Sequence, residues 1–345
     1  MENIDYIDEV DTLEEKISEE IQMLIPITFR GERIDKTLAQ LLPDFSRSRI
    51  KQWLDRGLIT RNDQVLTAKS SAFGNETILL KIPEDPQNLA FSPENIPLEV
   101  VFEDADIAVI NKPPGMVVHP AAGNWTGTML NGLLFHIPEC AQVPRAGIVH
   151  RLDKDTSGLL VVAKTLQAQT NLVRQLQERS VNRRYFALVW GEFSNSTTIN
   201  APIGRDPRDR LKMGVVRNSS GKPAITHITP LGEISLDKAI ISLLACKLET
   251  GRTHQIRVHL ESIGHPLLND PIYKKKVPIQ AFQKLKEQFS IETAMPGQAL
   301  HAAVLGFNHP VSGKYMSWSA EPPVGYLTFL RETGFEDESW SQIFE

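Results

Sequence analysis

The most informative stretch of this chain spans residues 147–163 and reads GIVHRLDKDTSGLLVVA. It begins as a short polar loop crowded with charged side chains, and residues 159–163 at its end are an apolar strand. A polar loop at the mouth of a buried strand is where a rigid scaffold presents catalytic groups. The segment 153–158 is also good turn chemistry, with Asp153 or Asp155 as the capping residue. The residues alone leave both interpretations open.

Apolar segments on both sides of this loop predict a large domain in which strands outnumber helices. We expect strands at residues 98–102, 107–110, 159–163, 185–189, 240–248 and 255–259. Helices are expected at 129–136 and at 166–179, the second with Leu172, Val173 and Leu176 facing inward. Because strands and helices do not alternate one for one, the pattern predicts an α+β fold with a largely antiparallel sheet.

Residues 27–83 read as a separate small domain of two helices and short strands. Ile34 and Leu38 begin the apolar face of a first helix, and Ser46 can cap a second one with Ile50 and Trp53 on its apolar side. Short strands are expected at 58–60, 65–66 and 77–82. The segment 84–97 is rich in proline and polar residues, which is typical of a linker.

The net charge of -5 is unevenly distributed along the 345 residues. Residues 1–26 hold nine acids against Lys16, and five more acids follow Arg331, which leaves 28 acids and 36 bases in between. A basic body permits phosphate binding without proving it. We expect acidic, solvated segments at 1–26 and 332–345 around a main domain at 98–331.

Several features bound the cellular setting of the chain. Its two cysteines, Cys140 and Cys246, support neither a disulfide framework nor a CxxC metal site, which favours a reducing compartment. No apolar run approaches the roughly 20 residues that span a bilayer. The acidic N-terminus matches neither a signal peptide nor a transit peptide. We therefore expect a cytoplasmic protein, with a monomer as the default.

The second predicted helix of the small domain carries four bases, within the segment FSRSRIKQWLDR at 45–56. Charge alone favours a solvated helix face. Together with Arg33-Ile34-Asp35 before it and Gly57-Leu58-Ile59 after it, however, the segment resembles the alpha-L RNA-binding domain. That resemblance implies two helices and a small sheet whose bases, including Arg47, Arg49 and Lys51, contact the RNA phosphate backbone.

Three blocks in the large domain resemble the RluA-type pseudouridine synthases, in that family's order. They are HRLDKDTSGL at 150–159, RRYFALV at 183–189 and ETGRTHQIRVHL at 249–260. Smaller matches lie at 115–120, 265–271 and 300–302, so that the resemblance covers about residues 30–330. It implies a pseudouridine synthase fold and the isomerisation of uridine to pseudouridine in structured RNA. The overall match is most like the branch that acts on large-subunit ribosomal RNA.

The resemblance implies that Asp153 is the catalytic aspartate, Tyr185 the active-site tyrosine and Arg257 the active-site base. These roles suit the chemistry, because breaking the bond from ribose to nitrogen develops positive charge on the sugar, which a carboxylate can attack or stabilise. A guanidinium would hold that carboxylate through paired hydrogen bonds. The tyrosine ring offers a flat face to the detached uracil. Tyr185 as a core residue and Arg257 as an ordinary ion-pair partner are the alternatives.

A uridine in folded RNA reaches a buried carboxylate only after leaving its stack. The resemblance implies that Arg151, beside the catalytic loop, helps to fill the vacated space. Lys154, Arg183, Arg184 and Arg252 are candidates for contact with nearby phosphates, or simply solvated bases.

No metal or nucleotide cofactor is expected. His150, His254 and His259 lack the companion ligands of a metal site, and on the expected strand positions 254 and 259 have opposite parity. No GxGxxG or P-loop pattern occurs.

Two other functional classes remain open. An RNA-binding factor that remodels RNA would keep the fold without the chemistry, and a glycosidase or nucleoside hydrolase would use an aspartate against a sugar. Hydrolases of this kind usually need a paired acid and base and do not need an RNA-binding domain. Transfer RNA is the alternative substrate for the pseudouridine synthase.

Overall fold

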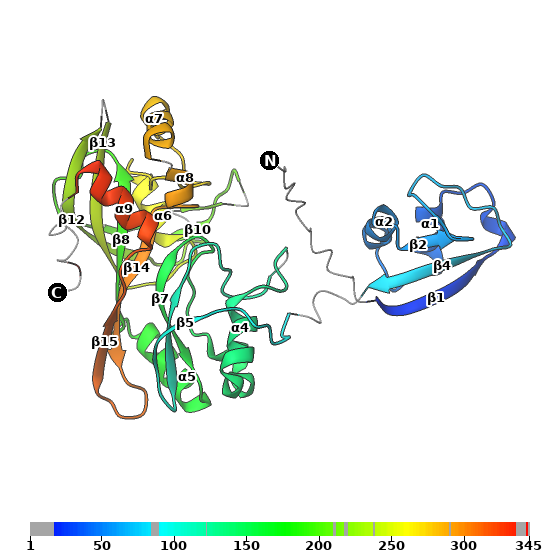
Figure 1. Cartoon of the computed structure of the whole chain (residues 1–345), viewed down its shortest axis with the longest axis horizontal. Coiled ribbons are helices and arrows are strands. Elements are labelled where there is room, and N and C mark those ends of the chain that lie inside the picture. Colours follow the sequence, from blue (N-terminus) through cyan, green and yellow to red (C-terminus); the bar gives the residue numbers. More distant parts are fainter. Residues whose placement is uncertain are drawn as a thin grey trace, which may run out of the picture. The chain divides into compact units, whose positions relative to one another are not determined.

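The computed structural model describes residues 17–83, 90–121, 123–209, 212–216, 220–236, 239–289, 291–335 and 343. The chain divides into two compact units, residues 1–89 and residues 90–345 (Figure 1). Within the described ranges, no helix combines the length and the apolar composition needed to cross a bilayer.

The first unit packs two helices on a small antiparallel sheet. The strands, in spatial order, are β1 (Ile17–Ile25), β4 (Glu76–Pro83), β2 (Ile59–Arg61) and β3 (Gln64–Val65). The helical segments are η1 (Ile27–Phe29), α1 (Ile34–Leu41) and α2 (Arg47–Asp55). As predicted, the Ser46 hydroxyl caps α2 by accepting the backbone N–H of Arg49 at 3.3 Å. The apolar sides of both helices are buried, with Ile34, Leu38 and Ile50 fully enclosed.

Strand β1 corrects the boundary predicted at residue 27. Residues 17–25 pair antiparallel with β4, from Ile17 opposite Pro83 to Ile25 opposite Glu76. Ile25 is fully buried, whereas most other side chains of β1 are exposed. An edge strand needs few apolar residues, which is why the acidic composition concealed it. The rest of the expected acidic segment, residues 1–16, lies outside the described residues.

The second unit is built on a large mixed sheet. Its strands, in spatial order, are β5 (Glu99–Glu103), β6 (Ile107–Lys112), β7 (Ser157–Ala163), β14 (Leu300–Asn308), β8 (Asn182–Trp190), β13 (Ala239–Leu248), β12 (Ile225–Leu236) and β9 (Thr197–Asn200), with β15 (Tyr315–Ser319) also on β14. Strands β7 and β14 are parallel, and all other neighbours in this sheet are antiparallel. A separate hairpin joins β10 (Ile203–Arg205) to β11 (Met213–Val215). The prediction of an α+β fold with a largely antiparallel sheet is confirmed.

Helices cover both faces of this sheet. Helices α4 (Met129–His136) and α6 (Gln255–Ser262) pack on one face, and α5 (Leu166–Gln177), α7 (Ile279–Phe289), α8 (Ile291–Ala294) and α9 (Val324–Thr333) contribute to the cores of the other. Two 3-10 turns, η2 (Pro138–Gln142) and η3 (Pro144–Gly147), follow α4. Alternation along β8 shows the arrangement, because Tyr185 and Ala187 face the first core while Phe186 and Leu188 face the second. The central strands are therefore apolar on both sides.

One predicted strand is wrong. Residues 255–259 belong to helix α6, in which every residue from Gln255 to Leu260 is buried. A helix buried all round has no amphipathic period, so the alternation of Ile256 and Val258 with polar residues imitated a strand. Helix 166–179 is confirmed as α5, although Val173 is 36% exposed and does not face inward as expected.

The expected linker and acidic tail are both shorter than predicted. Of residues 84–97, the segment 90–97 packs on α4, where the Asn131 amide donates to the carbonyls of Ala90 and Ser92 at 3.3 and 2.8 Å. Residues 84–89 lie outside the described residues. In the expected tail at 332–345, α9 continues to Thr333, and Phe335 and Ile343 are buried in the core beneath α9. Residues 336–342 and 344–345 lie outside the described residues.

Candidate active site

The loop of Asp153 is anchored to the sheet from several sides. It leads directly into β7, whose residues are all buried. The ammonium of Lys112, itself fully buried, donates to the carbonyls of Lys154, Pro113 and Met116 at 2.8, 2.8 and 2.9 Å. Burial lowers the pKa of Lys112 to about 7, against the opposing effect of nearby carboxylates. Three carbonyls match the three donors of an ammonium, so this side chain fixes the loop without occupying the cleft.

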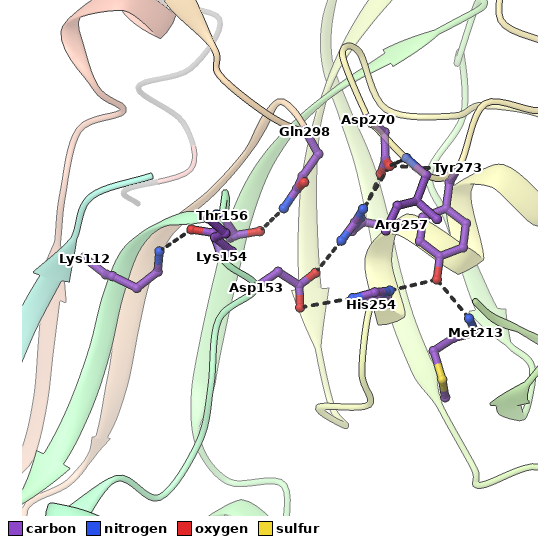
Figure 2. A network of polar contacts seen from close by, with 11 residues as sticks. Lys112, Asp153, Lys154, Thr156, Met213, His254, Arg257, Asp270, Tyr273 and Gln298 are labelled. Carbon is purple, nitrogen blue, oxygen red and sulfur yellow. Dashed lines mark hydrogen bonds and ion pairs between the residues drawn. The ribbon is translucent and has the colours of Figure 1, made fainter. Parts of the chain in front are cut away.

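The Asp153 carboxylate lies against the guanidinium of Arg257. Nη1 of Arg257 donates to Oδ2 of Asp153 at 3.0 Å, and the side chain of Asp153 is 16% exposed (Figure 2). The sequence predicts paired hydrogen bonds from Arg257 to Asp153. Arg257 makes only one hydrogen bond to Asp153 and forms its pair with Asp270 instead. Nε and Nη2 of Arg257 donate to Asp270 at 2.8 and 2.9 Å. Burial opposes the charged form of Arg257, but the hydrogen bonds and charges of Asp270 and Asp153 raise its pKa on balance.

Tyr185 lies on β8 and is 5% exposed. Its side chain packs in the first core and also lines the cleft that contains Asp153, so its position is compatible with both interpretations that the sequence left open. Burial raises the pKa of Tyr185, with a lowering effect of Arg183 and a raising effect of Asp153. The hydroxyl is therefore protonated in the free protein at neutral pH.

A cleft of about 860 Å³ unites the three predicted catalytic residues. Besides Asp153, Tyr185 and Arg257, its lining includes Arg151, Arg252 and His254. The lining comes from the loop before β7, from β8 and from the loop that enters α6, which are distant in sequence. The cleft presents the carboxylates of Asp153 and Glu249, the phenol of Tyr185 and several cationic groups to whatever binds there.

The bases predicted to contact RNA in the second unit divide into three groups. Arg151 and Arg252 are exposed side chains of the cleft. Arg183 also lines the cleft but is only 6% exposed, and its Nη2 donates to the Glu249 carbonyl at 3.3 Å. Arg184, the next residue on β8, faces the other side of the sheet and donates to the carbonyl of Ile343 at 2.9 Å. The structure therefore does not bring Arg184 to the cleft.

Bases of the first unit are also unequal. Arg47 is engaged by the buried carboxylate of Asp35, with Nη2 at 2.7 Å and Nε at 3.1 Å from Oδ2. The guanidinium of Arg49 lies 5.8 Å from the Trp53 ring centroid, and Lys51 is exposed. Arg47 thus has a structural contact that the sequence did not indicate, and Lys51 is on the surface as predicted.

The histidines do not form a metal site in the described part of the chain. His150 Nε2 accepts the backbone N–H of Val161 at 3.1 Å, and His259 lies between Thr226 and the Ala201 carbonyl. The parity argument for His254 and His259 was wrong, because these residues cap and form α6. One other group, Asp104, Asp106 and His309, gathers metal-type donors, but its short contact joins His309 Nε2 to Asp104 at 2.9 Å.

Sequence reasoning missed the support of the carboxylate. In the sequence, Asp270 stands only within the family match at 265–271, and nothing marks Tyr273 or Gln298. Gln298 donates to the Thr156 hydroxyl at 2.9 Å, which ties the loop of Asp153 to the segment before β14. No local pattern marks such residues, because their side-chain partners, Arg257 for Asp270 and Thr156 for Gln298, are more than ten residues away along the chain. Polar residues that are more than nine-tenths buried, such as Asp270 and Gln298, are the structural signal.

Comparisons with known proteins identify the family of this chain. Residues 106–262 match the family model described as RNA pseudouridylate synthase. Ribosomal large subunit pseudouridine synthase D of Neisseria meningitidis serogroup B is 47% identical over 99% of this chain and 91% of that protein. The protein of the same name from Pseudomonas aeruginosa is 46% identical over 89% of this chain and 93% of its own length.

The chain belongs to the RluA-type RNA pseudouridylate synthases. It is an isomerase that converts uridine in RNA to pseudouridine. The fold is also shared with a solved structure. Human RNA pseudouridylate synthase domain containing 4 matches with a TM-score of 0.52 at 23% identity, over 68% of this chain and 92% of that one.

Proposed function

We propose that this isomerase modifies specific uridines of large-subunit ribosomal RNA, with Asp153 as its catalytic carboxylate. The observation that carries the proposal is the meeting of Asp153, Tyr185 and Arg257 in one cleft of about 860 Å³. Asp153 and Arg257 are 104 residues apart in sequence and yet 3.0 Å apart as donor and acceptor. A partly exposed carboxylate on a rigid loop is a suitable partner for an extruded ribose.

The reaction breaks the bond from ribose carbon 1 to nitrogen 1 of uracil and forms a bond from the same carbon to carbon 5. Asp153 meets the positive charge that develops on the sugar. Arg257 holds the carboxylate through Oδ2, and its own position is fixed by Asp270. Tyr185, in the cleft lining, supplies a flat face for the detached uracil, and in this proposal its hydroxyl takes part in removing the proton of carbon 5. Carbon 5 loses one proton and nitrogen 1 takes up one after its bond to the ribose is broken, so the product has the mass of the substrate.

RNA recognition in this proposal uses two surfaces. At the cleft, Arg151 fills the space left by the extruded uridine, and Arg183 and Arg252 bind phosphates or charged groups nearby. The first unit acts as an alpha-L RNA-binding domain, in which Arg49 and Lys51 contact the phosphate backbone. Arg47 contributes mainly by ordering that surface, because Asp35 already binds its guanidinium.

The choice of substrate rests on similarity. The relatives named ribosomal large subunit pseudouridine synthase D match nearly the whole chain, including the first unit. Transfer RNA is the alternative substrate, since shape rather than sequence directs recognition of structured RNA. Action on ribosomal RNA would place the protein in the cytoplasm, where we expect it to work as a monomer.

The test is a map of pseudouridine in ribosomal and transfer RNA from cells with and without the gene. Positions in large-subunit ribosomal RNA should lose pseudouridine and regain it with the wild-type gene but not with Asp153→Asn. Loss of pseudouridine from transfer RNA alone would show that transfer RNA, not ribosomal RNA, is the substrate. An Asp153→Asn gene that restores every position would refute the role of the carboxylate.

A further inference from the structure

His254 occupies an unusual position beside the carboxylate. It is the N-cap of α6 with φ of 57°, in the left-handed region, so its ring turns back toward the loop of Asp153. Nε2 lies 3.9 Å from Oδ1 of Asp153, and Nδ1 lies 2.8 Å from the hydroxyl of Tyr273 (Figure 2). The ring thus stands between a carboxylate and a phenol.

Tyr273 is held as firmly as its neighbours. It is 1% exposed, its backbone N–H donates to Asp270 at 2.9 Å, and the guanidinium carbon of Arg257 lies 5.0 Å from its ring centroid. The backbone N–H of Met213 donates to the Tyr273 hydroxyl oxygen at 3.1 Å. Burial raises the pKa of Tyr273 to about 12, so this oxygen keeps its own proton at neutral pH.

These contacts fix the direction of the hydrogen bond to His254. The Tyr273 oxygen already accepts from Met213, and its proton needs an acceptor because a buried unsatisfied hydroxyl costs about 1–3 kcal/mol. Nδ1 of His254 is the acceptor at 2.8 Å. In a neutral imidazole the proton then resides on Nε2. The opposite tautomer would also direct the lone pair of Nε2 at the Asp153 oxygen.

The charge state of the ring follows from its surroundings. Burial lowers the pKa of His254; Asp153 and Asp270 act to raise it, and Arg257 and Arg151 to lower it. The hydrogen bond that Nδ1 accepts from the Tyr273 hydroxyl also lowers the pKa of His254, because only the neutral ring can accept it. His254 is therefore a neutral donor at neutral pH.

The two oxygens of Asp153 consequently differ. Oδ2 accepts from Arg257 at 3.0 Å, whereas Oδ1 faces the His254 N–H at 3.9 Å, which is beyond a hydrogen bond. We propose that His254 is a positioning residue: its Nε2–H, directed by Tyr273, presents the positive end of its dipole to Oδ1 of Asp153 from 3.9 Å and so orients that oxygen as the reacting one, without a hydrogen bond that would occupy it. This inference rests on the proposed catalytic role of Asp153. An imidazolium in the same place would instead pair with the carboxylate and withdraw it from the substrate.

The first test reads the tautomer directly. Nitrogen NMR of the full chain with ¹⁵N-labelled histidine reports which ring nitrogen carries the proton, and the spectrum of His254→Gln identifies the signal by its loss. At pH 7.5 we expect His254 to be neutral with the proton on Nε2. In Tyr273→Phe the two tautomers should mix. A wild-type ring protonated on Nδ1, or on both nitrogens, would overturn the inference.

The second test is single-turnover kinetics on an RNA substrate. His254→Ala should reduce the rate of chemistry about 10- to 100-fold with KM nearly unchanged. His254→Gln, whose amide nitrogen can replace Nε2 as a donor, should recover most of that loss. In Tyr273→Phe the acid limb of the pH profile should move to higher pH, since the pKa of His254 is no longer held down by the phenol. Equal rates for the Ala and Gln variants, with an unmoved acid limb, would refute a positioning role.

Two further variants distinguish a failure of this inference from a failure of the proposed function. His309→Gln is the matched control, because His309 also bonds a carboxylate through Nε2 but lies outside the cleft lining, and its kinetics should be unchanged. Asp153→Asn shows whether the carboxylate is catalytic at all. An inactive Asp153→Asn beside a fully active His254→Ala would sink only the role of His254. An active Asp153→Asn would remove the proposed function itself. If His254→Ala does not fold, the Gln and Tyr273→Phe variants decide the result.

Discussion

Asp270 binds Arg257 along one edge of the guanidinium, with hydrogen bonds of 2.8 and 2.9 Å. The same carboxylate accepts the backbone N–H groups of Ile272 and Tyr273 at 2.8 and 2.9 Å. Arg257 is therefore oriented without help from Asp153, and its Nη1 remains to hold the Asp153 carboxylate. Fixing a charged group through a second carboxylate is a way to position it before substrate arrives.

This arrangement predicts opposite costs for two similar substitutions. Asp153→Asn should reduce activity by roughly a thousandfold or more. It should change the free energy of unfolding by no more than about 1 kcal/mol. Asp270→Asn should reduce the free energy of unfolding by about 3–5 kcal/mol, because it leaves Arg257 as a buried, half-compensated charge. Urea denaturation and a pseudouridine assay on both variants measure these effects. Equal losses of stability would contradict this division of roles.

The exposed arginines of the cleft should contribute to RNA affinity through charge. Arg151→Ala and Arg252→Ala should raise KM, and each should reduce the slope of log affinity against log salt by about 0.7–0.9 if its side chain neutralises one phosphate. Arg184→Ala should leave the slope unchanged, because its side chain donates to the Ile343 carbonyl away from the cleft. Binding titrations at several salt concentrations decide the matter. A slope that changes most with Arg184 would place the RNA on the opposite face.

Gly158 allows β7 and β14 to approach closely behind the loop of Asp153. Its φ is +108°, and a Cβ there would stand 2.6 Å from the backbone nitrogen of Ala302. Gly158→Ala should therefore lower the free energy of unfolding by at least about 2 kcal/mol and reduce activity, since rigid backbone must move. Gly313→Ala, with φ of +71° but open space around it, should cost only about 1 kcal/mol. Similar costs in urea denaturation would show that strain, rather than the contact with β14, dominates.

His301 predicts a loss of stability in acid. It is 1% exposed, it bonds Ser157 and the Ala320 carbonyl, and burial lowers its pKa to about 4 from an ordinary 6.5. The unfolded chain binds a proton at this residue below pH 6.5 and the folded chain does not, so stability falls as pH decreases toward 4. From pH 8 to pH 5 this one group should account for about 2 kcal/mol.

The measurement for His301 is the free energy of unfolding as a function of pH. The His301→Gln variant serves as the reference, because it lacks the titrating ring while retaining polar atoms near Ser157. Its stability should depend less steeply on pH between 6.5 and 4 than that of the wild type. Parallel curves for the two proteins would show that His301 does not contribute this term.

Local sequence was sufficient where a segment stabilises itself. The helix predicted at 129–136 is α4 to the residue, and Ser46 caps α2 as expected. The turn at Asn62 and Asp63 has positive φ at both residues, which suits the hairpin that these residue types favour. Patterning failed for α6, where Gln255 accepts the Thr250 hydroxyl and the Arg252 N–H and so starts a helix within a segment that alternates like a strand.

The catalytic candidates were identified from sequence, whereas their geometry was not. The motif around Asp153 and its resemblance to a known family named Tyr185 and Arg257 in advance, and the fold places all three in one cleft. Arg183 and Arg184, two neighbouring arginines predicted to contact RNA, lie in different surroundings. Alternation along β8 turns Arg183 into the cleft and Arg184 away from it, and nothing in the two side chains themselves distinguishes them.

The sequence by itself determined the family and which side chains are candidates for the chemistry, that the main sheet is largely antiparallel, and where locally capped helices begin. Only the tertiary structure decided that Arg257 shares its hydrogen bonds between two carboxylates, and that Tyr273 directs the proton of His254. The reason is that hydrogen bonds act over about 3 Å. Their partners here lie on the loop before β7, on α6 and on the segment after it. Packing on both faces of the sheet brings these elements together, and no short-range pattern encodes that distance.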